Sequence, residues 1–114
     1  MTAKELADTI EKILDSKKGI DIQVIDLEGK TDLADYFVIV TGTSTPHIRA
    51  LSEEVEFKLK EEYRIPADHT EGRESGRWIL LDYGSVIVHV FHEQERAFYS
   101  LEKLWEGRYG KIRE

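Results

Sequence analysis

The spacing of hydrophobic and polar residues predicts two amphipathic helices in the first part of the chain. In both segments apolar residues recur every three or four positions, so they share one face of a helix. The first helix is expected from about Thr2 to Lys17, and the second follows Pro46 and ends near Tyr63. Phe57 lies on the polar face of the second helix, where its ring meets solvent or a partner. The two apolar stripes are Leu6, Ile10, Ile13 and Leu14, and then Ile48, Leu51, Val55 and Leu59.

Shorter apolar runs predict the strands of a sheet. The run Tyr36–Val40 is apolar on both faces, which is typical of a central strand covered on both sides. A short edge strand is expected within the polar segment Ala67–Gly76. The remaining strands are expected at Ile20–Leu27, Trp78–Tyr83 and Val86–Phe91.

A third helix is expected from Glu93 to Tyr109, and a charged tail, 110–114, ends the chain. The residues expected on the buried face of this helix are Phe98, Leu101, Trp105 and Tyr109. Together the elements predict a single domain over residues 1–114 with an α/β (α+β-like) fold. Its centre is a mixed sheet of about five strands flanked by helices.

Local signals mark the ends of the first two helices. Thr2 and Glu5 have the spacing of a capping box, in which each side chain satisfies a free backbone donor. Gly19 is expected to leave the first helix in the left-handed conformation. Ser44 or Thr45 is expected to cap the second helix.

The segment Trp78–Phe91 is predicted to be a β-hairpin with two unlike faces. Gly84-Ser85 has the glycine-first order of a two-residue hairpin turn, which pairs Tyr83 with Val86. Alternation then assigns each side chain to one face. The first face is almost purely aliphatic and is expected to pack on helices: Ile79, Leu81, Tyr83, Val86, Val88 and Val90. The second, which we call the mixed face, consists of Trp78, Leu80, Asp82, Ile87, His89 and Phe91.

The mixed face is too apolar for a solvated surface and too polar for a sealed core. Aromatic anchors beside a few polar groups are typical of the inside of a protein–protein interface. The alternative is that another helix covers this face, with Asp82 at its wet edge. Asp82 and His89 are diagonal neighbours with no nucleophile beside them, so an ion pair or a partner contact is expected rather than catalysis. The pattern leaves the interface and the covered core open.

Composition narrows the class of function. The chain has no cysteine, which excludes disulfides, thiolate metal sites and cysteine nucleophiles. Acidic residues outnumber basic ones, 23 to 16, giving a net charge of −7. That balance disfavours direct nucleic-acid binding and favours a basic protein partner. The chain has neither a signal-peptide pattern nor a stretch near the ~20 apolar residues of a membrane span, so a cytoplasmic protein is expected.

The histidines show no spacing that would gather metal ligands. His89 and His92 are three apart on one strand and face opposite sides, while His47 and His69 belong to other elements. No HExxH motif occurs. We therefore expect no metal site and no cofactor.

The loop Thr41–Ser44, between the central strand and the second helix, is a candidate for phosphate binding. Free amides and the helix dipole favour an anion there, and Arg49 is available to neutralise it. The loop lacks the GxxxxGK[ST] and GxGxxG patterns, so an ordinary capped loop is the favoured interpretation. The strand–loop–helix order is also reminiscent of nucleotidyltransferases, but the metal-binding acid pair is missing and Asp82 stands alone in the hairpin.

Several segments, in this order along the chain, resemble the ribosomal silencing factor family, also called RsfS or Iojap. The resemblance implies a nucleotidyltransferase-like fold without catalytic acids or activity. In segment 43–47 the chain departs from the Asn-Ser-x-x-Gln of the family, so no role is carried over to that loop. The matching segments are 34–44, 71–72, 78–84, 88–91 and 98–105.

The resemblance also implies a partner and a mechanism. Family members dock on ribosomal protein fourteen of the large ribosomal subunit, block joining of the small subunit and so repress translation when nutrients are short. They are often homodimers. Their binding surface is centred on the tryptophan strand and its neighbour. Carried over to this chain, the partner-binding residues are Trp78, Leu80, Leu81, Asp82, Tyr83, His89 and Phe91.

Three hypotheses about function therefore stand side by side. The first is a non-catalytic repressor that covers a surface of the large subunit. The second is a nucleotidyltransferase-like enzyme that uses the Thr41–Ser44 loop. The third is a homodimerisation module whose mixed face is consumed by self-association.

Overall fold

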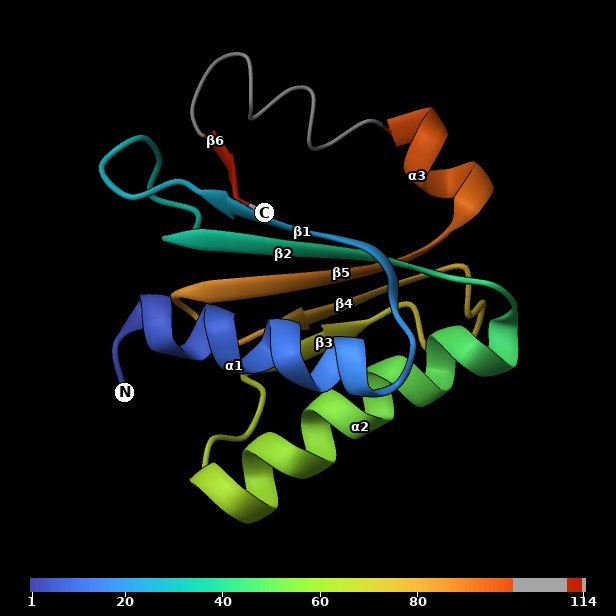
Figure 1. The fold of residues 1–114 in the computed structure, drawn as a ribbon, viewed down its shortest axis with the longest axis horizontal. Coiled ribbons are helices and arrows are strands. Elements are labelled where there is room, and N and C mark those ends of the chain that lie inside the picture. Colours follow the sequence, from blue (N-terminus) through green and yellow to red (C-terminus); the bar gives the residue numbers. More distant parts are fainter. Residues whose placement is uncertain (100–110, 114) are drawn as a thin grey trace.

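The computed structural model describes residues 1–99 and 111–113, and within them it contains three helices and a six-stranded sheet (Figure 1). The predicted mixed sheet flanked by helices is confirmed. The helices are α1 (Ala3–Ser16), α2 (Thr45–Tyr63) and α3 (Glu93–Tyr99). The strands are β1 (Ile20–Asp26), β2 (Tyr36–Gly42), β3 (His69–Glu71), β4 (Trp78–Asp82), β5 (Val86–His92) and β6 (Lys111–Arg113).

The strands follow the order β3-β4-β5-β2-β1-β6 across the sheet. Only β2 and β5 pair in parallel; the other neighbours are antiparallel. A parallel pair needs a long crossover, and here α2, β3 and β4 lie between the two strands in the chain. All seven residues of β2 are buried, so the prediction of a central strand covered on both sides is confirmed.

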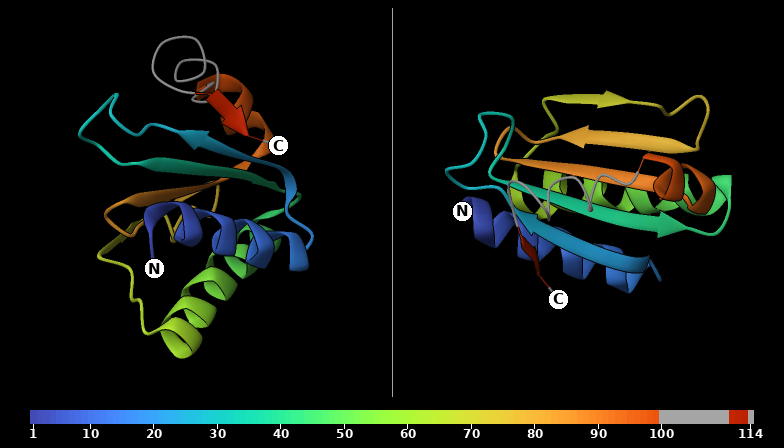
Figure 2. Two further views of the ribbon diagram at one scale, coloured as in Figure 1. Left: turned by 60° about the vertical axis from the view of Figure 1, so that its left-hand side comes forward. Right: turned by 90° about the horizontal axis from the view of Figure 1, so that it is seen from above.

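The two faces of the sheet carry separate apolar cores. Helices α1 and α2 cover one face, while α3 lies on the other (Figures 1 and 2). The larger core joins the apolar stripes of α1 and α2 to the side chains of the sheet that face them. The smaller core, on the α3 side, is built from Ile25, Leu27, Ala34, Phe37, Ile39 and Phe91, with Trp78 and Ile87 packed against it.

The predicted helix caps are confirmed, except at the end of α1. The Thr2–Glu5 capping box is present, and the Ser44 side chain accepts the backbone N–H of His47 to cap α2. After α1, however, the left-handed residue is Lys18, with φ 62°, so the prediction for Gly19 was wrong. Gly19 is needed for space instead, because a Cβ there would lie 2.7 Å from Cγ2 of Val40.

The C-terminal segment differs in part from the prediction. Helix α3 starts at Glu93, as expected, and its described residues end at Tyr99; the rest of the predicted helix and its buried face lie outside the described residues. The predicted charged tail is wrong for Lys111–Arg113, which pairs antiparallel with β1. Three residues rich in charge carry no periodic signal, whereas the outer edge of β1 offers unpaired backbone groups.

Gly72, between β3 and β4, is predicted to be a structural requirement. Its φ is +87°, and a Cβ there would lie 1.9 Å from the carbonyl oxygen of Trp78. Gly29 has a similar φ of +73° but no atom within 4 Å of the added Cβ, so it is the matched control. Both alanine variants carry left-handed strain of about 1–2 kcal/mol. Gly72→Ala should lose at least about 2 kcal/mol more free energy of unfolding than Gly29→Ala in urea titrations; equal losses would contradict this account.

Candidate functional site

The β4–β5 hairpin has the predicted turn and register. Trp78 pairs with Phe91, and Gly84 adopts a φ of 81° in the turn. The N–H of Tyr83 donates to the carbonyl oxygen of Val86 over 2.9 Å. The aliphatic face of the hairpin is buried in the larger core, against α1 and α2, as predicted. The mixed face points to the opposite side of the sheet, toward α3.

An aromatic cluster forms the centre of the mixed face. The rings of Trp78 and Phe91 are stacked with their centroids 4.7 Å apart. The imidazole of His89 packs edge-on against Phe37 of β2, also at 4.7 Å. His89 and Phe91 are buried, at 5% and 1% exposure. The remaining side chains of this face, which are half-buried, are Trp78, Leu80, Asp82 and Ile87.

His89 is the polar centre of this cluster. The indole N–H of Trp78 donates a hydrogen bond to Nδ1 of His89 over 3.2 Å. Burial lowers the pKa of His89 to about 4, so the ring is neutral near pH 7. A neutral imidazole that accepts at Nδ1 carries its proton on Nε2. That N–H is buried and finds no hydrogen-bond partner among the described residues.

Asp82 lies at the turn end of the mixed face. Its Oδ1 accepts the backbone N–H of Gly84 over 2.7 Å, so the carboxylate caps the hairpin turn. It is opposite Ile87 in the sheet, whereas His89 is opposite Leu80. In the described part of the chain no hydrogen bond or ion pair joins Asp82 to His89. The carboxylate therefore retains its charge at the edge of the face.

Two arginines attach α3 beside the mixed face. Nε of Arg77 contacts a carboxylate oxygen of Glu95 over 2.8 Å, immediately before the start of β4. Arg96 is buried and donates to Oγ1 of Thr41 over 2.9 Å, with Asp21 at 3.5 Å. Figure 2 shows α3 over the sheet on the side opposite α2. A helix therefore covers part of this face, as the alternative interpretation expected.

Sequence analysis missed Arg77, Arg96 and Phe37 as parts of this site. Each lies outside the hairpin alternation that defined the mixed face. Phe37 reads only as one apolar residue of a central strand, and the two arginines read as ordinary surface charges. Their partners lie up to 75 positions away in the chain, as in the Arg96–Asp21 pair. No local pattern links residues so far apart.

Five of the seven predicted partner-binding residues share the mixed face, and two do not. Leu81 is fully buried on the α1–α2 side, and Tyr83 is 7% exposed there. Burial raises the pKa of the Tyr83 hydroxyl. The two side chains lie on the other side of the hairpin because alternation turns every second residue away. In this structure Leu81 has no surface for a partner, so its predicted role can only be support of the strand.

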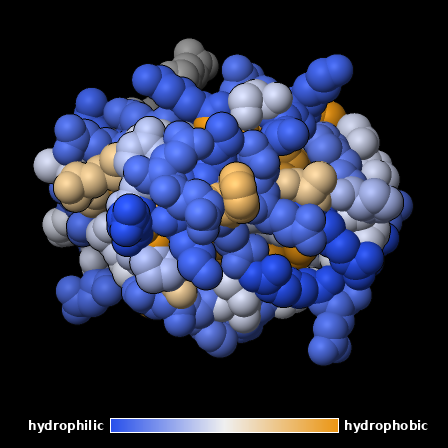
Figure 3. Space-filling model, turned by 90° about the horizontal axis from the view of Figure 1, so that it is seen from below, coloured by the Kyte–Doolittle hydropathy of each residue, from blue (hydrophilic) through white to orange (hydrophobic). Residues whose placement is uncertain are grey.

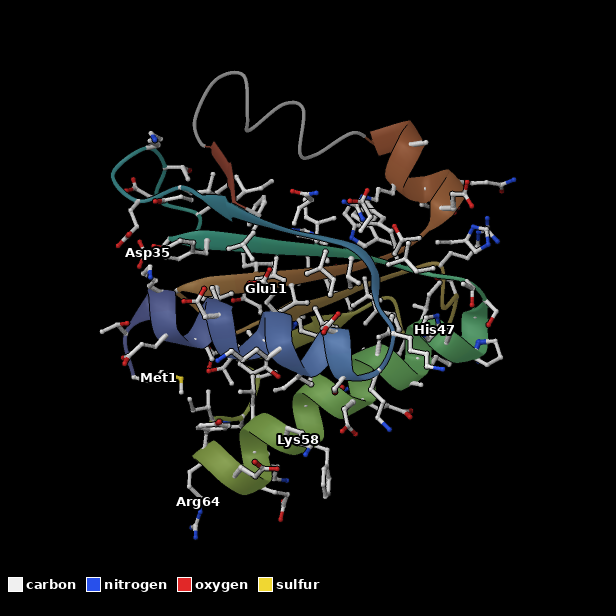
Figure 4. All side chains as sticks on the ribbon, viewed as in Figure 1. Met1, Glu11, Asp35, His47, Lys58 and Arg64 are labelled. Atoms are coloured by element: carbon white, nitrogen blue, oxygen red, sulfur yellow. The ribbon has the colours of Figure 1, made fainter. Side chains whose placement is uncertain are left out.

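The Thr41–Ser44 loop has little free hydrogen-bonding capacity for a phosphate. The N–H of Thr43 donates to Nδ1 of His47, and Nε2 of His47 donates in turn to the carbonyl oxygen of Lys17. Figure 4 labels His47 at the start of α2, where it links that helix to the end of α1. Arg49, expected near the loop, instead donates to the carbonyl oxygens of Arg73 and Glu74. The expectation for Arg49 was wrong because the β3–β4 loop offers it two acceptors.

Other features of the described residues point to no further chemistry. Within residues 1–99 and 111–113, no group of three His, Asp or Glu side chains is placed to hold a metal ion. None of the described helices combines the length and apolarity that a membrane crossing requires. The α2 side of the molecule is largely hydrophilic (Figure 3), and Phe57 is exposed there, as predicted. The mixed face thus remains the strongest candidate for a binding surface.

Comparison with known proteins identifies the family. Residues 1–113 match the family model described as "Ribosomal silencing factor during starvation". A ribosomal silencing factor RsfS from Halalkalibacterium halodurans is 39% identical over 105 residues, covering 92% of this chain and 89% of that protein. A crystal structure of a protein from Chromobacterium violaceum superposes with a TM-score of 0.89 at 36% identity, covering 95% of this chain and 89% of that one.

A mitochondrial relative extends the comparison beyond bacteria. The mouse protein named "Mitochondrial assembly of ribosomal large subunit protein 1" is 33% identical over 109 residues, which are 93% of this chain and 47% of the mouse protein. The bacterial matches cover nearly the whole chain, and the family model spans all but its last residue. The resemblance found in the sequence is confirmed, and the chain belongs to the family of ribosomal silencing factors, RsfS.

Proposed function

We propose that this chain is a cytoplasmic, non-catalytic repressor that binds ribosomal protein fourteen of the large ribosomal subunit and blocks joining of the small subunit. Ribosome-associated silencing follows from the family. The large subunit as target is supported by the name of the mouse relative, which refers to assembly of that subunit. The partner protein and the steric block come from the family resemblance and remain the finer part of the proposal.

The mixed face is the single observation that carries this proposal. Four of its side chains stay half-buried around a stacked Trp78–Phe91 pair, on a surface that no described helix fully covers. A partially exposed aromatic anchor beside apolar neighbours is the usual core of a binding surface. Asp82 adds negative charge at its edge, and the net charge of −7 suits a basic ribosomal protein.

The mechanism needs only occupancy. A domain with principal extents of 33 × 33 × 23 Å that sits on a surface required by the small subunit prevents contact there. No bond is made or broken, so no catalytic group is needed. Affinity comes from apolar area on the mixed face, and charge increases the rate of encounter and selects the partner.

A subunit-joining assay tests the proposal. Purified large subunits are mixed with the chain, small subunits are added, and the products are separated on a sucrose gradient. The fraction of joined ribosomes should fall as the chain is titrated, and the chain should migrate with free large subunits. The same chain should bind isolated ribosomal protein fourteen in a pull-down. Normal joining at saturating chain, or no migration with large subunits, would refute the proposal.

We also propose that the chain forms a homodimer, as its family resemblance implies. The half-buried apolar side chains of the mixed face are a candidate contact between copies as well as with the ribosome. If the copies meet there, Trp78→Ala should shift the mass measured by light scattering from dimer toward monomer. A dimer that persists unchanged in this variant would place the contact elsewhere and leave the mixed face available to the ribosome.

A further inference from the structure

We propose that His89 is a positioning residue that holds the indole of Trp78 in the orientation required for docking. This inference rests on the proposed function, because it assumes that Trp78 contacts the partner. It is a separate claim about how one buried side chain prepares another for binding. Three observations carry it.

The first observation is the hydrogen bond between the two side chains. Nε1 of Trp78 lies 3.2 Å from Nδ1 of His89, and their ring centroids are 5.9 Å apart. Trp78 and His89 lie on adjacent strands, β4 and β5, and face the same side of the sheet. An indole has only one polar atom, so this bond selects one of the ring orientations that stacking alone permits.

The second observation is that His89 is itself rigidly held. Phe37 packs edge-on against one side of its ring, and the ring of Phe91 is nearly parallel to it at 5.9 Å. The side chain is 5% exposed, so water does not compete for Nδ1. An acceptor that cannot move fixes the direction of the donor that it receives. The orientation of Trp78 is therefore transmitted from the central strand β2 through His89.

The third observation is the unpaired Nε2 of His89. A buried N–H without a partner is unfavourable, and native proteins retain few such groups. A leucine of similar size would avoid that unpaired donor and would lose only the acceptor at Nδ1. The imidazole is therefore poorly explained by stability. The hydrogen bond to Trp78 is the one interaction in the described residues that requires a nitrogen at this position.

The hydrogen bond also determines which chemistry Trp78 offers. Its single donor is used inside the chain, so the exposed part of the ring presents hydrocarbon and π surface. A partner group suited to that surface is an aliphatic side chain or the guanidinium of an arginine, rather than a hydrogen-bond acceptor. Arginine also matches the net charge of −7 on this chain.

Matched variants separate positioning from packing. His89→Asn keeps an acceptor near the place of Nδ1, whereas His89→Leu keeps the volume and removes the acceptor. We expect His89→Leu to weaken binding to large subunits about fivefold, because the freed indole must be ordered on binding. His89→Asn should restore most of that loss. In a Trp78→Phe background, which has no indole N–H, His89→Leu should cause no further loss.

A spectroscopic measurement reads the same bond without the ribosome. The chain has two tryptophans, Trp78 and Trp105, and Trp78→Phe assigns their indole N–H resonances. The Trp78 proton should lie downfield in the wild type and in His89→Asn, and should move upfield in His89→Leu. An unchanged resonance, or wild-type affinity of His89→Leu, would overturn the positioning role.

The two proposals fail in different ways. If the wild-type chain binds no large subunit, the proposed function is wrong and the docking role of the hydrogen bond is overturned with it. In that case the resonance still decides whether His89 orients Trp78. If the wild type binds and His89→Leu binds equally well, the proposed function stands and only the positioning role is overturned. Thermal melts of each variant check that loss of binding is not loss of fold.

Discussion

Trp78→Ala is expected to weaken binding to the large ribosomal subunit by at least about 30-fold, which corresponds to about 2 kcal/mol. Trp78 is the largest half-exposed side chain on the mixed face, and Phe91 holds its ring by stacking at 4.7 Å. Removing the indole takes away the central anchor and opens a gap above Phe91. The neighbouring side chains are too small to fill that gap.

The measurement is cosedimentation of the variant with purified large subunits over a range of chain concentrations. Phe57→Ala is the matched control, because Phe57 is also an exposed aromatic, at 61%, but lies on the solvent side of α2. It should bind like the wild type. Trp78 also packs against the smaller core, so circular dichroism must show that the alanine variant is folded at the assay temperature. Equal binding by the folded variant and the wild type would remove Trp78 from the interface.

Acid conditions are expected to lower stability through His89. Burial lowers the pKa of His89 in the folded chain to about 4, against about 6.5 when the chain is unfolded. Between these values the unfolded chain binds a proton that the folded chain does not, so the free energy of unfolding falls as pH decreases. The contribution of His89 is fully present above about pH 6.5 and lost toward pH 4. From about pH 7 to about pH 5 the loss should be about 2 kcal/mol.

Urea titrations at these two pH values measure the effect, and two variants isolate its source. His89→Leu has nothing to protonate at this position and should lose about 2 kcal/mol less than the wild type on acidification. Leu80→Ala, on the same face, should be less stable at both pH values yet keep the wild-type difference between them. Glu5 and Glu95, whose pKa values are lowered by Thr2 and Arg77, lose their contributions mainly at more acidic pH. A pH dependence of His89→Leu identical to that of the wild type would contradict the assignment.

Much of the fold could be predicted because its signals are local. The apolar stripes of α1 and α2 follow helical periodicity, and the strands follow runs of apolar residues. Gly84 is the first residue of a two-residue turn, and that turn alone determines the register of β4 on β5. The two faces of the hairpin follow from alternation once the register is known. Periodicity and turn chemistry act over a few residues, so they can be read directly from the chain.

Other features depended on contacts between distant segments. Lys18, rather than Gly19, adopts the left-handed conformation because Gly19 must let β2 approach the end of α1. Residues 111–113 become a strand because β1 has a free edge, and nothing within those three residues indicates it. Arg49 turns away from the Thr41–Ser44 loop toward two carbonyl oxygens that only the folded chain brings near. In each case the deciding neighbour is remote in the sequence.

The mixed face combines both kinds of information. The sequence by itself determined that Trp78, His89 and Phe91 share one side of the hairpin, because a strand alternates with a period of two. Only the tertiary structure decided that Phe37 and α3 bury His89 and Phe91 while Trp78 stays half-exposed. It also decided that His89 accepts from the indole of Trp78. Burial and hydrogen bonding depend on how strands and helices stack in space, and alternation along one strand carries no information about that stacking.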